Sequence, residues 1–512
     1  MKKVLLKKVL LIILDGFGLS HRLKGNAIAN ARMPFYHSLL KQHPHTILHA
    51  AGKYVGLLKG YIGNSEVGHL HIGAGRLVQQ DLRRIFDAID DKSFFENKAV
   101  LEAIKHVKQT DGTLHLMGLL SDAGVHSHYE HLFALIRLAK KQGVKSLAVH
   151  AFLDGRDVAP MSAEKYLRKT EQVLANSNRS WKIATITGRF YAMDRDKRWH
   201  RTREAYDMLT GGNPTKNNSI GALSSIGALK ESYRRGRSDE FVFPTRLTDA
   251  VIRAGDSIVF FNYRADRARQ LTHAFVDANF THFARKKIRN LFFATMASYE
   301  KDLPVKVIFQ PEHVCNTLGA VVSKAGLKQF RLAETEKWAH VTFFFNGLTD
   351  KVFKGEHRML VPSPKVRTYD KTPRMSAGRI TAAAMANLHK NYALMVVNYA
   401  NPDMIGHTGK YVPAIKANEF VDACLSRLVP LAQHNDYAVI ITADHGNAEE
   451  MNHADGSPCT SHTRNDVPFI LISDATYRIK KITNAALYHI APTVLDLMGI
   501  KKPKEMINGI LI

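Results

Sequence analysis

Short runs of apolar and β-branched residues recur along the whole chain, and stretches with a helical spacing of apolar positions separate them. Runs of this kind that end in polar residues are typical of strands buried on both faces. Their alternation with helices predicts an α/β fold with mostly parallel sheets. The predicted strands are Val9–Leu14, Leu114–Leu119, Leu147–Leu153, Ile183–Thr187, Ser257–Asn262, Leu291–Ala294, Leu394–Val397, Ala438–Thr442 and Phe469–Ile472.

The first predicted strand follows basic residues and could be mistaken for a signal peptide. Its apolar run covers only Val9–Leu14, Lys7 and Lys8 interrupt any longer run, and no small-residue cleavage site follows. A buried parallel strand explains this segment better, and no other segment approaches the roughly 20 apolar residues of a membrane span. We therefore expect a cytoplasmic protein with no membrane partner. A reducing compartment also fits the three cysteines, none of which forms a CxxC pair: Cys315, Cys424 and Cys459.

The charge balance is unusual for a chain of this size. Its 512 residues predict two or three domains, and 72 Lys and Arg against 46 Asp and Glu give a formal net charge of +26. Such a charge is compatible with nucleic-acid binding. However, the basic residues are spread along the chain, and no aromatic-interleaved nucleic-acid module is present. We expect no nucleic-acid partner, and steering of a small anionic substrate would account for part of the excess.

Carboxylates and imidazoles, without thiolates, follow several of the predicted strands. In open α/β sheets, ligands bind beyond the carboxyl ends of the strands. A set of this composition suits Mn²⁺ or Zn²⁺ better than Ca²⁺, and six or seven ligands are enough for two ions. The candidates are Asp15 in LDGFG, Asp403 and His407 in NPDMIGHTG, Asp444 and His445 in TADHGNAE, and His462 in SHTRN.

Each of these candidates, taken alone, also has a structural explanation. An Asp after a strand is often a helix N-cap, and most histidines lie on the surface or in the core. The adjacent pair Asp444 and His445 is the strongest candidate. If the distant ligands meet, the first and last segments form one domain and the middle is an insertion. We place the joints near Gln79 and His313, which gives residues 1–79 with 314–512 as a metal-binding domain and 80–313 as an inserted substrate-binding domain.

Ser65 lies in the glycine-rich segment GYIGNSEVGHLHIGAGR. The segment is not the GxSxG turn of serine hydrolases, because Val67 replaces the last glycine, and it is neither a GxxxxGKS nor a GxGxxG phosphate loop. Ser65 could simply cap a helix that begins near Glu66. A serine hydroxyl is a weak nucleophile at neutral pH, so a nucleophilic Ser65 would need activation by a metal ion.

The middle of the chain carries arginines at strand-to-helix junctions, which indicate bidentate capture of phosphate or carboxylate. Exposed arginines often interact only with solvent and bind no ligand, and this alternative carries weight in so basic a chain. Against it, Arg156 and Arg264 closely follow predicted buried strands. The candidates are His126 in SDAGVHSH, Arg156 and Asp157 in FLDGRDVAP, Arg189 and Arg195 in TGRFYAMDRDKRW, Arg264 and Arg267 in FFNYRADRARQL, and Lys337 in EKWAHVTFFFNG.

These motifs together resemble the cofactor-independent phosphoglycerate mutases of the alkaline phosphatase superfamily, and the resemblance extends over nearly the whole chain. It implies a discontinuous metal-bearing phosphatase domain with an inserted transferase domain. It also implies conversion of 3-phosphoglycerate to 2-phosphoglycerate through a phosphoserine and two divalent ions, with Mn²⁺ as first choice and Zn²⁺ or Co²⁺ as alternatives. A monomer is expected on the same ground.

The resemblance assigns a role to each candidate residue. Ser65 would carry the phosphoryl group, Asp157 would act as acid or base, and Lys337 would stabilise charge on the phosphoryl group. One ion would be held by Asp15, Ser65, Asp444 and His445, and the other by Asp403, His407 and His462. The glycerate part would be bound by His126, Arg156, Arg189, Arg195, Arg264 and Arg267. Two alternatives remain: a metal-dependent phosphomonoesterase or other mutase of the superfamily, and a basic nucleic-acid-binding protein.

Overall fold

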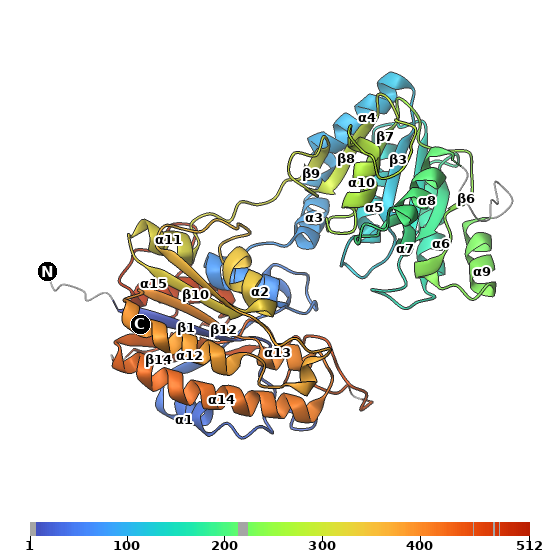
Figure 1. Ribbon diagram of the computed structural model, residues 1–512. Helices are drawn as coiled ribbons and strands as arrows, with labels where there is room; N and C mark the ends of the chain where they lie inside the picture. Colours follow the sequence, from blue (N-terminus) through green and yellow to red (C-terminus); the bar gives the residue numbers. More distant parts are fainter. Residues whose placement is uncertain (1–6, 213–223, 454, 475–476, 481, 512) are drawn as a thin grey trace. The chain divides into compact units, whose positions relative to one another are not determined.

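Two separate seven-stranded sheets organise the chain in this computed structural model (Figure 1). The structure describes residues 7–212, 224–453, 455–474, 477–480 and 482–511. Contacts divide the chain into unit 1, which combines Met1–Gln80 with His313–Ile512, and unit 2, which is Asp81–Glu312. Unit 1 is therefore built from two segments that are distant in the sequence.

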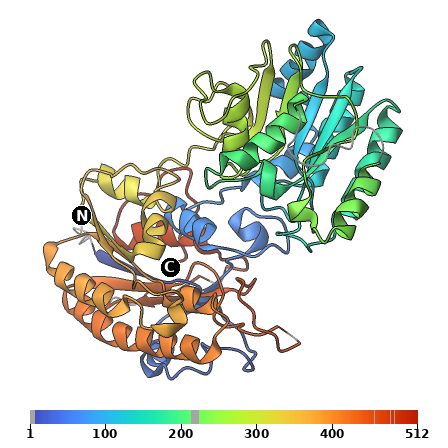
Figure 2. The same ribbon diagram turned by 45° about the vertical axis from the view of Figure 1, so that its right-hand side comes forward.

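The sheet of unit 1 has the strand order β11-β10-β12-β1-β13-β14-β2. The strands from β11 to β13 pair in parallel, and β14 pairs antiparallel with both of its neighbours. Figures 1 and 2 show the blue N-terminal strand among orange strands from the end of the chain. The strands are β1 (Lys8–Leu14), β2 (His45–Leu48), β10 (Gln329–Glu334), β11 (Glu356–Val361), β12 (Leu394–Tyr399), β13 (Tyr437–Thr442) and β14 (Val467–Ile472).

Helices cover both faces of this sheet, so strands such as β1 are apolar on both sides, as expected for a central parallel strand. The helices α1 (Pro34–Gln42), α12 (Ala377–Asn387), α13 (Asn401–Gly406) and α14 (Tyr411–His434) pack together on one face. On the other face lie α2 (Ser65–Ala74), α11 (Leu318–Lys324) and α15 (Ile490–Leu497). Shorter helical turns occupy Gly52–Val55, Thr335–Lys337, His340–Phe344, Tyr369–Lys371, Leu388–Lys390 and Leu487–His489.

Unit 2 has its own sheet, in the order β6-β5-β4-β3-β7-β8-β9, and every pairing except β5 with β6 is parallel. Its strands are β3 (Leu114–Leu119), β4 (Leu147–Leu153), β5 (Lys182–Gly188), β6 (Thr245–Arg246), β7 (Ser257–Phe260), β8 (Phe292–Ala297) and β9 (Lys306–Phe309). Its helices are α3 (Asp81–Asp90), α4 (Lys98–Thr110), α5 (Tyr129–Lys141), α6 (Ala163–Ser177), α7 (Arg189–Ala192), α8 (Trp199–Thr210), α9 (Ser225–Arg234) and α10 (Arg269–Val276), with short turns at Ser93–Glu96 and Asp239–Phe241.

The two mostly parallel sheets confirm the predicted α/β fold class. In the described part of the chain, none of the helices combines the length and apolarity that crossing a bilayer requires. In both units the polar residues that follow the parallel strands gather at one edge of the sheet, and the candidate residues lie there.

Candidate metal centre and arginine cluster

Ser65 is the first residue of α2, and the preceding Asn64 caps the helix. The Asn64 side chain accepts a hydrogen bond from the Val67 amide at 2.9 Å, which satisfies a helix N–H that would otherwise have no partner. The explanation of Ser65 as a capping residue is therefore wrong. Its hydroxyl, only slightly exposed, is free to face the end of the central strands.

Three ionisable side chains meet at the Ser65 hydroxyl. Oγ donates to Asp15 Oδ1 at 3.0 Å, Lys337 Nζ donates to Oγ at 2.8 Å, and His445 Nε2 lies 2.8 Å away. Asp15 follows β1, His445 follows β13 and Lys337 ends the turn after β10, so neighbouring strand ends bring the groups together. Two cationic donors on one oxygen favour its deprotonated form.

Lys337 lies at the centre of the carboxylates. Nζ is 2.5 Å from Asp15 Oδ1 and 2.6 Å from Asp403 Oδ2, and the side chain is buried. Burial alone would raise the pKa of each carboxyl group, but Lys337 and the nearby histidines hold the pKa values of Asp15 and Asp403 well below the usual range. All three groups are therefore charged at neutral pH.

His445 is fully buried beside three carboxylates. Burial lowers its pKa, but Asp444, Asp15 and Asp403 outweigh this effect and raise the pKa to about 10. The protonated ring points Nδ1 at the Gly446 carbonyl oxygen, 3.1 Å away, and Nε2 at Ser65. In the metal-free protein, His445 therefore holds a proton that a metal ion bound at Nε2 would have to displace.

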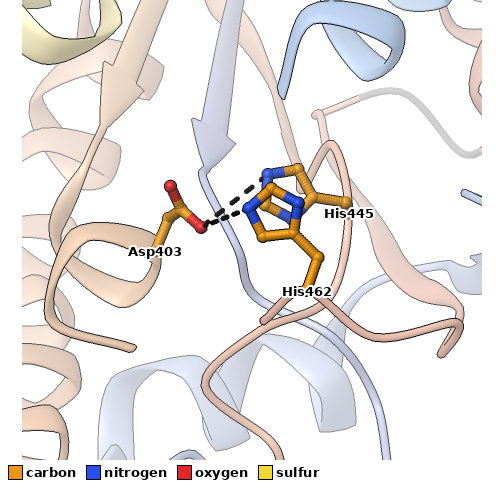
Figure 3. A group of neighbouring side chains, drawn as sticks. All are labelled: Asp403, His445 and His462. Carbon is orange, nitrogen blue, oxygen red and sulfur yellow. Dashed lines mark ion pairs between the residues drawn. The ribbon is translucent and has the colours of Figure 1, made fainter. Parts of the chain in front are cut away.

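A second group of ligand-type atoms adjoins the first. Figure 3 shows His445 and His462 turned toward one oxygen of Asp403, with His462 Nε2 at 3.2 Å and His445 Nε2 at 3.9 Å from Oδ1. His407 Nε2 lies 3.2 Å from the same oxygen and 2.9 Å from His462 Nε2. Two imidazole nitrogens and a carboxylate oxygen that converge in this way are typical of a metal site.

The donor atoms fit two divalent ions. Asp15, Asp444 and His445 can offer ligand atoms within 4.8 Å of one another, and so can Asp403, His445 and His462. Asp444 Oδ2 is buried and accepts no well-formed hydrogen bond within the described residues, although His69 Nδ1 lies 3.1 Å and His445 Nε2 3.6 Å away. A facing cation stabilises a buried carboxylate oxygen of this kind. His445 belongs to both groups, whereas the family resemblance had implied a place for it in one.

Several residues that the sequence did not single out hold the ligands in place. Asn398 Nδ2 donates to Asp15 Oδ2 at 2.8 Å and to His69 Nε2 at 3.0 Å. Asn447 Nδ2 donates to Asp403 Oδ1 at 2.8 Å. Partners of this kind fix the orientation of metal ligands. His69 lies one helical turn after Ser65, and this spacing could have indicated from the sequence that it helps to orient the ligands.

The absence of a side chain at Gly68 lets α2 approach the end of β13. A Cβ atom there would lie 2.5 Å from the Asp444 carbonyl oxygen and 2.7 Å from Asp444 Cβ. We expect Gly68→Ala to lower the free energy of unfolding by about 1–3 kcal/mol through overpacking. The helical control Gly378→Ala meets only ordinary contacts, at 3.5 Å or more, and should be neutral or stabilising. Denaturant unfolding of wild type and both variants measures these changes. A Gly68→Ala protein as stable as Gly378→Ala would contradict the predicted overpacking.

In unit 2, the predicted arginines gather around His126 and Asp157. Arg189 is buried and its Nη1 donates to Asp157 Oδ2 at 2.5 Å and to Asp154 Oδ1 at 2.6 Å. His126 Nε2 lies 3.9 Å from Asp157 Oδ2. Burial, followed by Arg189 and other arginines, lowers the pKa of His126 to about 3. His126 is therefore neutral and can accept or donate a hydrogen bond.

Of the remaining arginines, Arg156, Arg195 and Arg264 pair with carboxylates that sequence reasoning missed. Asp266 binds Arg195 Nη1 at 2.9 Å and lies 3.3 Å from Arg264 Nε, while Arg156 Nη2 pairs with Glu240 at 2.9 Å. Arg267 has a lowered pKa because of its burial and the repulsion from Arg189, Arg195 and Arg156. The excess of guanidinium groups over carboxylates forms a cluster suited to a small anion.

Comparison with known proteins identifies the family. The family described as "BPG-independent PGAM N-terminus" matches residues 85–301, and "Type I phosphodiesterase / nucleotide pyrophosphatase" matches residues 313–474. The chain is 51% identical over 512 residues to the "2,3-bisphosphoglycerate-independent phosphoglycerate mutase" of Moorella thermoacetica, covering 99% of this chain and 98% of that protein. The chain belongs to the 2,3-bisphosphoglycerate-independent phosphoglycerate mutases. The predicted resemblance to this mutase family is confirmed.

Two further comparisons agree with membership of the mutase family. A Nostoc protein of the same description is 47% identical, covering 99% of this chain and 95% of that protein. The solved structure of a Leishmania mexicana phosphoglycerate mutase covers 100% of this chain and 99% of its own, with a TM-score of 0.74 at 29% identity. The family and the two ligand groups together imply divalent metal ions.

Proposed function

We propose that the chain interconverts 3-phosphoglycerate and 2-phosphoglycerate without 2,3-bisphosphoglycerate, through a phosphoserine on Ser65. The observation that carries this proposal is the Ser65 hydroxyl, held at hydrogen-bond distance from Asp15, Lys337 and His445. Relatives of nearly full length bear the name of this mutase, which favours transfer to a glycerate hydroxyl over plain hydrolysis.

The residues of unit 1 would activate Ser65 and hold the phosphoryl group. Asp15, Ser65, Asp444 and His445 would bind one divalent ion, and Asp403, His407 and His462 the other, with His445 close to both groups. Bound ions would lower the pKa of the hydroxyl and neutralise charge on the phosphoryl oxygens. Lys337 supplies a fixed positive charge at the same oxygen, and the N-terminus of α2 favours the negative charge of phosphoserine.

The first transfer moves the phosphoryl group from substrate to enzyme. Deprotonated Ser65 Oγ attacks phosphorus, the bond from phosphorus to the 3-oxygen breaks, and Asp157, acting first as the acid, donates a proton to that oxygen as glycerate leaves. The arginine cluster of unit 2 would hold the glycerate carboxylate and keep the freed molecule at a high effective concentration. This retention is what distinguishes a mutase from a phosphatase.

The second transfer returns the phosphoryl group to the other hydroxyl. Asp157 takes the proton from the 2-hydroxyl, the 2-oxygen attacks phosphoserine, and Ser65 Oγ is released. Arg189 orients Asp157 through its bond to Oδ2, and neutral His126 lies beside the same oxygen. The remaining candidates, Arg156, Arg195, Arg264 and Arg267, would bind substrate oxygens.

A coupled assay for 2-phosphoglycerate tests the proposed function directly. We expect conversion of 3-phosphoglycerate in the absence of 2,3-bisphosphoglycerate, loss of activity in EDTA, and recovery on adding a divalent ion. Mn²⁺ should restore most activity, with Co²⁺ and Zn²⁺ less effective, because imidazole and carboxylate ligands without thiolate suit Mn²⁺. Release of inorganic phosphate as fast as 2-phosphoglycerate forms would instead indicate a phosphomonoesterase.

Metal affinity should depend on pH through His445. Its pKa of about 10 in the metal-free protein means that the ring holds a proton at neutral pH, and this proton competes with the ion. Affinity should therefore rise with pH by up to about tenfold per unit below pH 10. Calorimetric titration of Mn²⁺ at pH 6, 7 and 8 measures this, and buffers of different ionisation enthalpy count the released protons. A pH-independent affinity would be inconsistent with a protonated His445.

We further propose that the enzyme works as a cytoplasmic monomer without a nucleic-acid partner. The described cysteines are free, as expected in a reducing compartment. Light scattering coupled to gel filtration measures the mass, which should be near the 57.4 kDa of a single chain. A mass twice as large would exclude the monomer.

A further inference from the structure

A basic cavity of about 540 Å³ lies in unit 1, beside the segment that leads into α2. Its lining comes from the stretch after β2 and from the segment that follows His462, and none of its residues belongs to the ligand groups or the arginine cluster described above. The lining residues that carry the argument are His49, Lys53, Tyr54, Lys59, Arg464 and Asp466.

The cations of this cavity lack acidic partners. Lys53, Lys59 and Arg464 are exposed, and within the described residues no ion pair joins any of them to a carboxylate. Asp466 is the one carboxylate of the lining, and its Oδ1 is already bonded to His49 Nδ1 at 2.8 Å. Three cations against one carboxylate leave the lining with a net charge of +2 when His49 is neutral.

The backbone and aromatic rings of the cavity are fixed by contacts within unit 1. The His49 and Tyr54 rings stack with centroids 4.0 Å apart and an angle of 18°, and Tyr54 donates to Asn484 Oδ1 at 2.9 Å. The Gly52 amide donates to the Tyr61 carbonyl at 3.0 Å, which closes the loop that carries Lys53 and Lys59. The loop that carries Lys53 and Lys59 is therefore held in place by these contacts within unit 1.

The cavity is distinct from the metal centre although the chain connects them. His462 turns its ring to Asp403 and to the Gly63 carbonyl oxygen, at 3.1 Å from Nδ1, whereas Arg464, two residues later, lines the cavity. Gly60, with φ +89°, faces this arginine, since a Cβ atom there would lie 3.9 Å from Arg464 Nη1. The cations on the loop and on the second segment thus face one space.

We propose that this cavity is a second anion site that binds a phosphate group, separate from the catalytic one. A multivalent oxyanion can meet several ammonium and guanidinium donors at once, and the volume admits a free phosphate ion or a small phosphate ester.

Equilibrium dialysis with labelled inorganic phosphate at fixed ionic strength tests the proposal. The variant Lys53→Gln/Lys59→Gln/Arg464→Gln removes the three cations. The matched control, Lys41→Gln/Arg379→Gln/Lys390→Gln, removes equal charge from exposed positions of unit 1 that form no ion pair in the described part of the chain. Wild type and control should retain one more phosphate per chain than the cavity variant, whose affinity at this site should fall by at least about tenfold.

Two results of this dialysis would overturn the proposal. Equal stoichiometry in wild type and cavity variant would show that the cavity holds no phosphate, and an equal loss in the control would show a general charge effect.

A second dialysis with unlabelled 3-phosphoglycerate distinguishes a phosphate ester from the free phosphate ion as the ligand. Displacement from the additional site by excess ester indicates a phosphorylated metabolite, and retention of the label indicates the free ion. Thermal unfolding of both variants verifies that the fold is intact.

Discussion

Replacing Ser65 with alanine should reduce turnover of 3-phosphoglycerate by about 10⁴-fold or more, because the transfer would lose the oxygen that carries the phosphoryl group. The change removes one buried hydroxyl, so the fold should persist. Activity should not return on adding Mn²⁺. Incubation with labelled substrate and acid quenching should reveal phosphoprotein in wild type and none in the variant.

The matched control for this prediction is Ser38→Ala. Ser38 also lies in a helix of unit 1, and within the described residues its hydroxyl bonds only to the Phe35 carbonyl oxygen at 2.7 Å. This control should keep wild-type turnover and phosphoprotein. A Ser65→Ala enzyme that still isomerises phosphoglycerate would exclude the phosphoserine route.

Replacing Lys337 with methionine should have the largest effect on stability. The buried ammonium contacts Asp15 and Asp403 at 2.5 and 2.6 Å, and its loss would leave both carboxylates without their closest cation. In EDTA, we expect the free energy of unfolding to fall by about 3–5 kcal/mol. Added Mn²⁺ should recover part of this loss, because the ions would neutralise the same carboxylates, whereas kcat should stay reduced by about 10²-fold or more.

Chemical unfolding with EDTA and with Mn²⁺ measures both effects. Lys390→Met serves as the control, since Lys390 is exposed and should change stability by no more than about 0.5 kcal/mol. If Lys337→Met were as stable as this control in EDTA, the carboxylates would not depend on the ammonium, and the proposed role of Lys337 in charge neutralisation would fail.

The sequence predicted the central strands and the strand-end residues well, because buried parallel strands form continuous apolar runs. All nine predicted strands overlap observed ones. It missed β2, β6, β9, β10 and β11. The sequences QFRLAE of β10 and EHRMLV of β11 contain charged residues. Arg331 in β10 is fully buried, with Nη2 donating to Gln329 Oε1 at 2.7 Å. Burial of a charged side chain that is only partly hydrogen-bonded cannot be predicted from periodicity.

The groups that orient the ligands were also beyond sequence reasoning. Asn398 lies beside Asp15 because the parallel register of β1 and β12 pairs Ile13 with Asn398. That register depends on the tertiary packing of the sheet and not on any motif. Similarly, Asp266 and Glu240 were recognisable only as ordinary acidic residues until the fold brought them to Arg195 and Arg156.

The central position of β1 has a consequence for synthesis of the protein. This apolar strand ends at Leu14 and pairs with β12 and β13, which begin at Leu394 and Tyr437, so the first of its partners leaves the ribosome some 380 residues later. At about 5–20 residues per second, the delay is roughly 20–80 s. Unit 2 lies between these strands in the chain and can fold during the delay, while the nascent β1 segment stays open to chaperones and to aggregation.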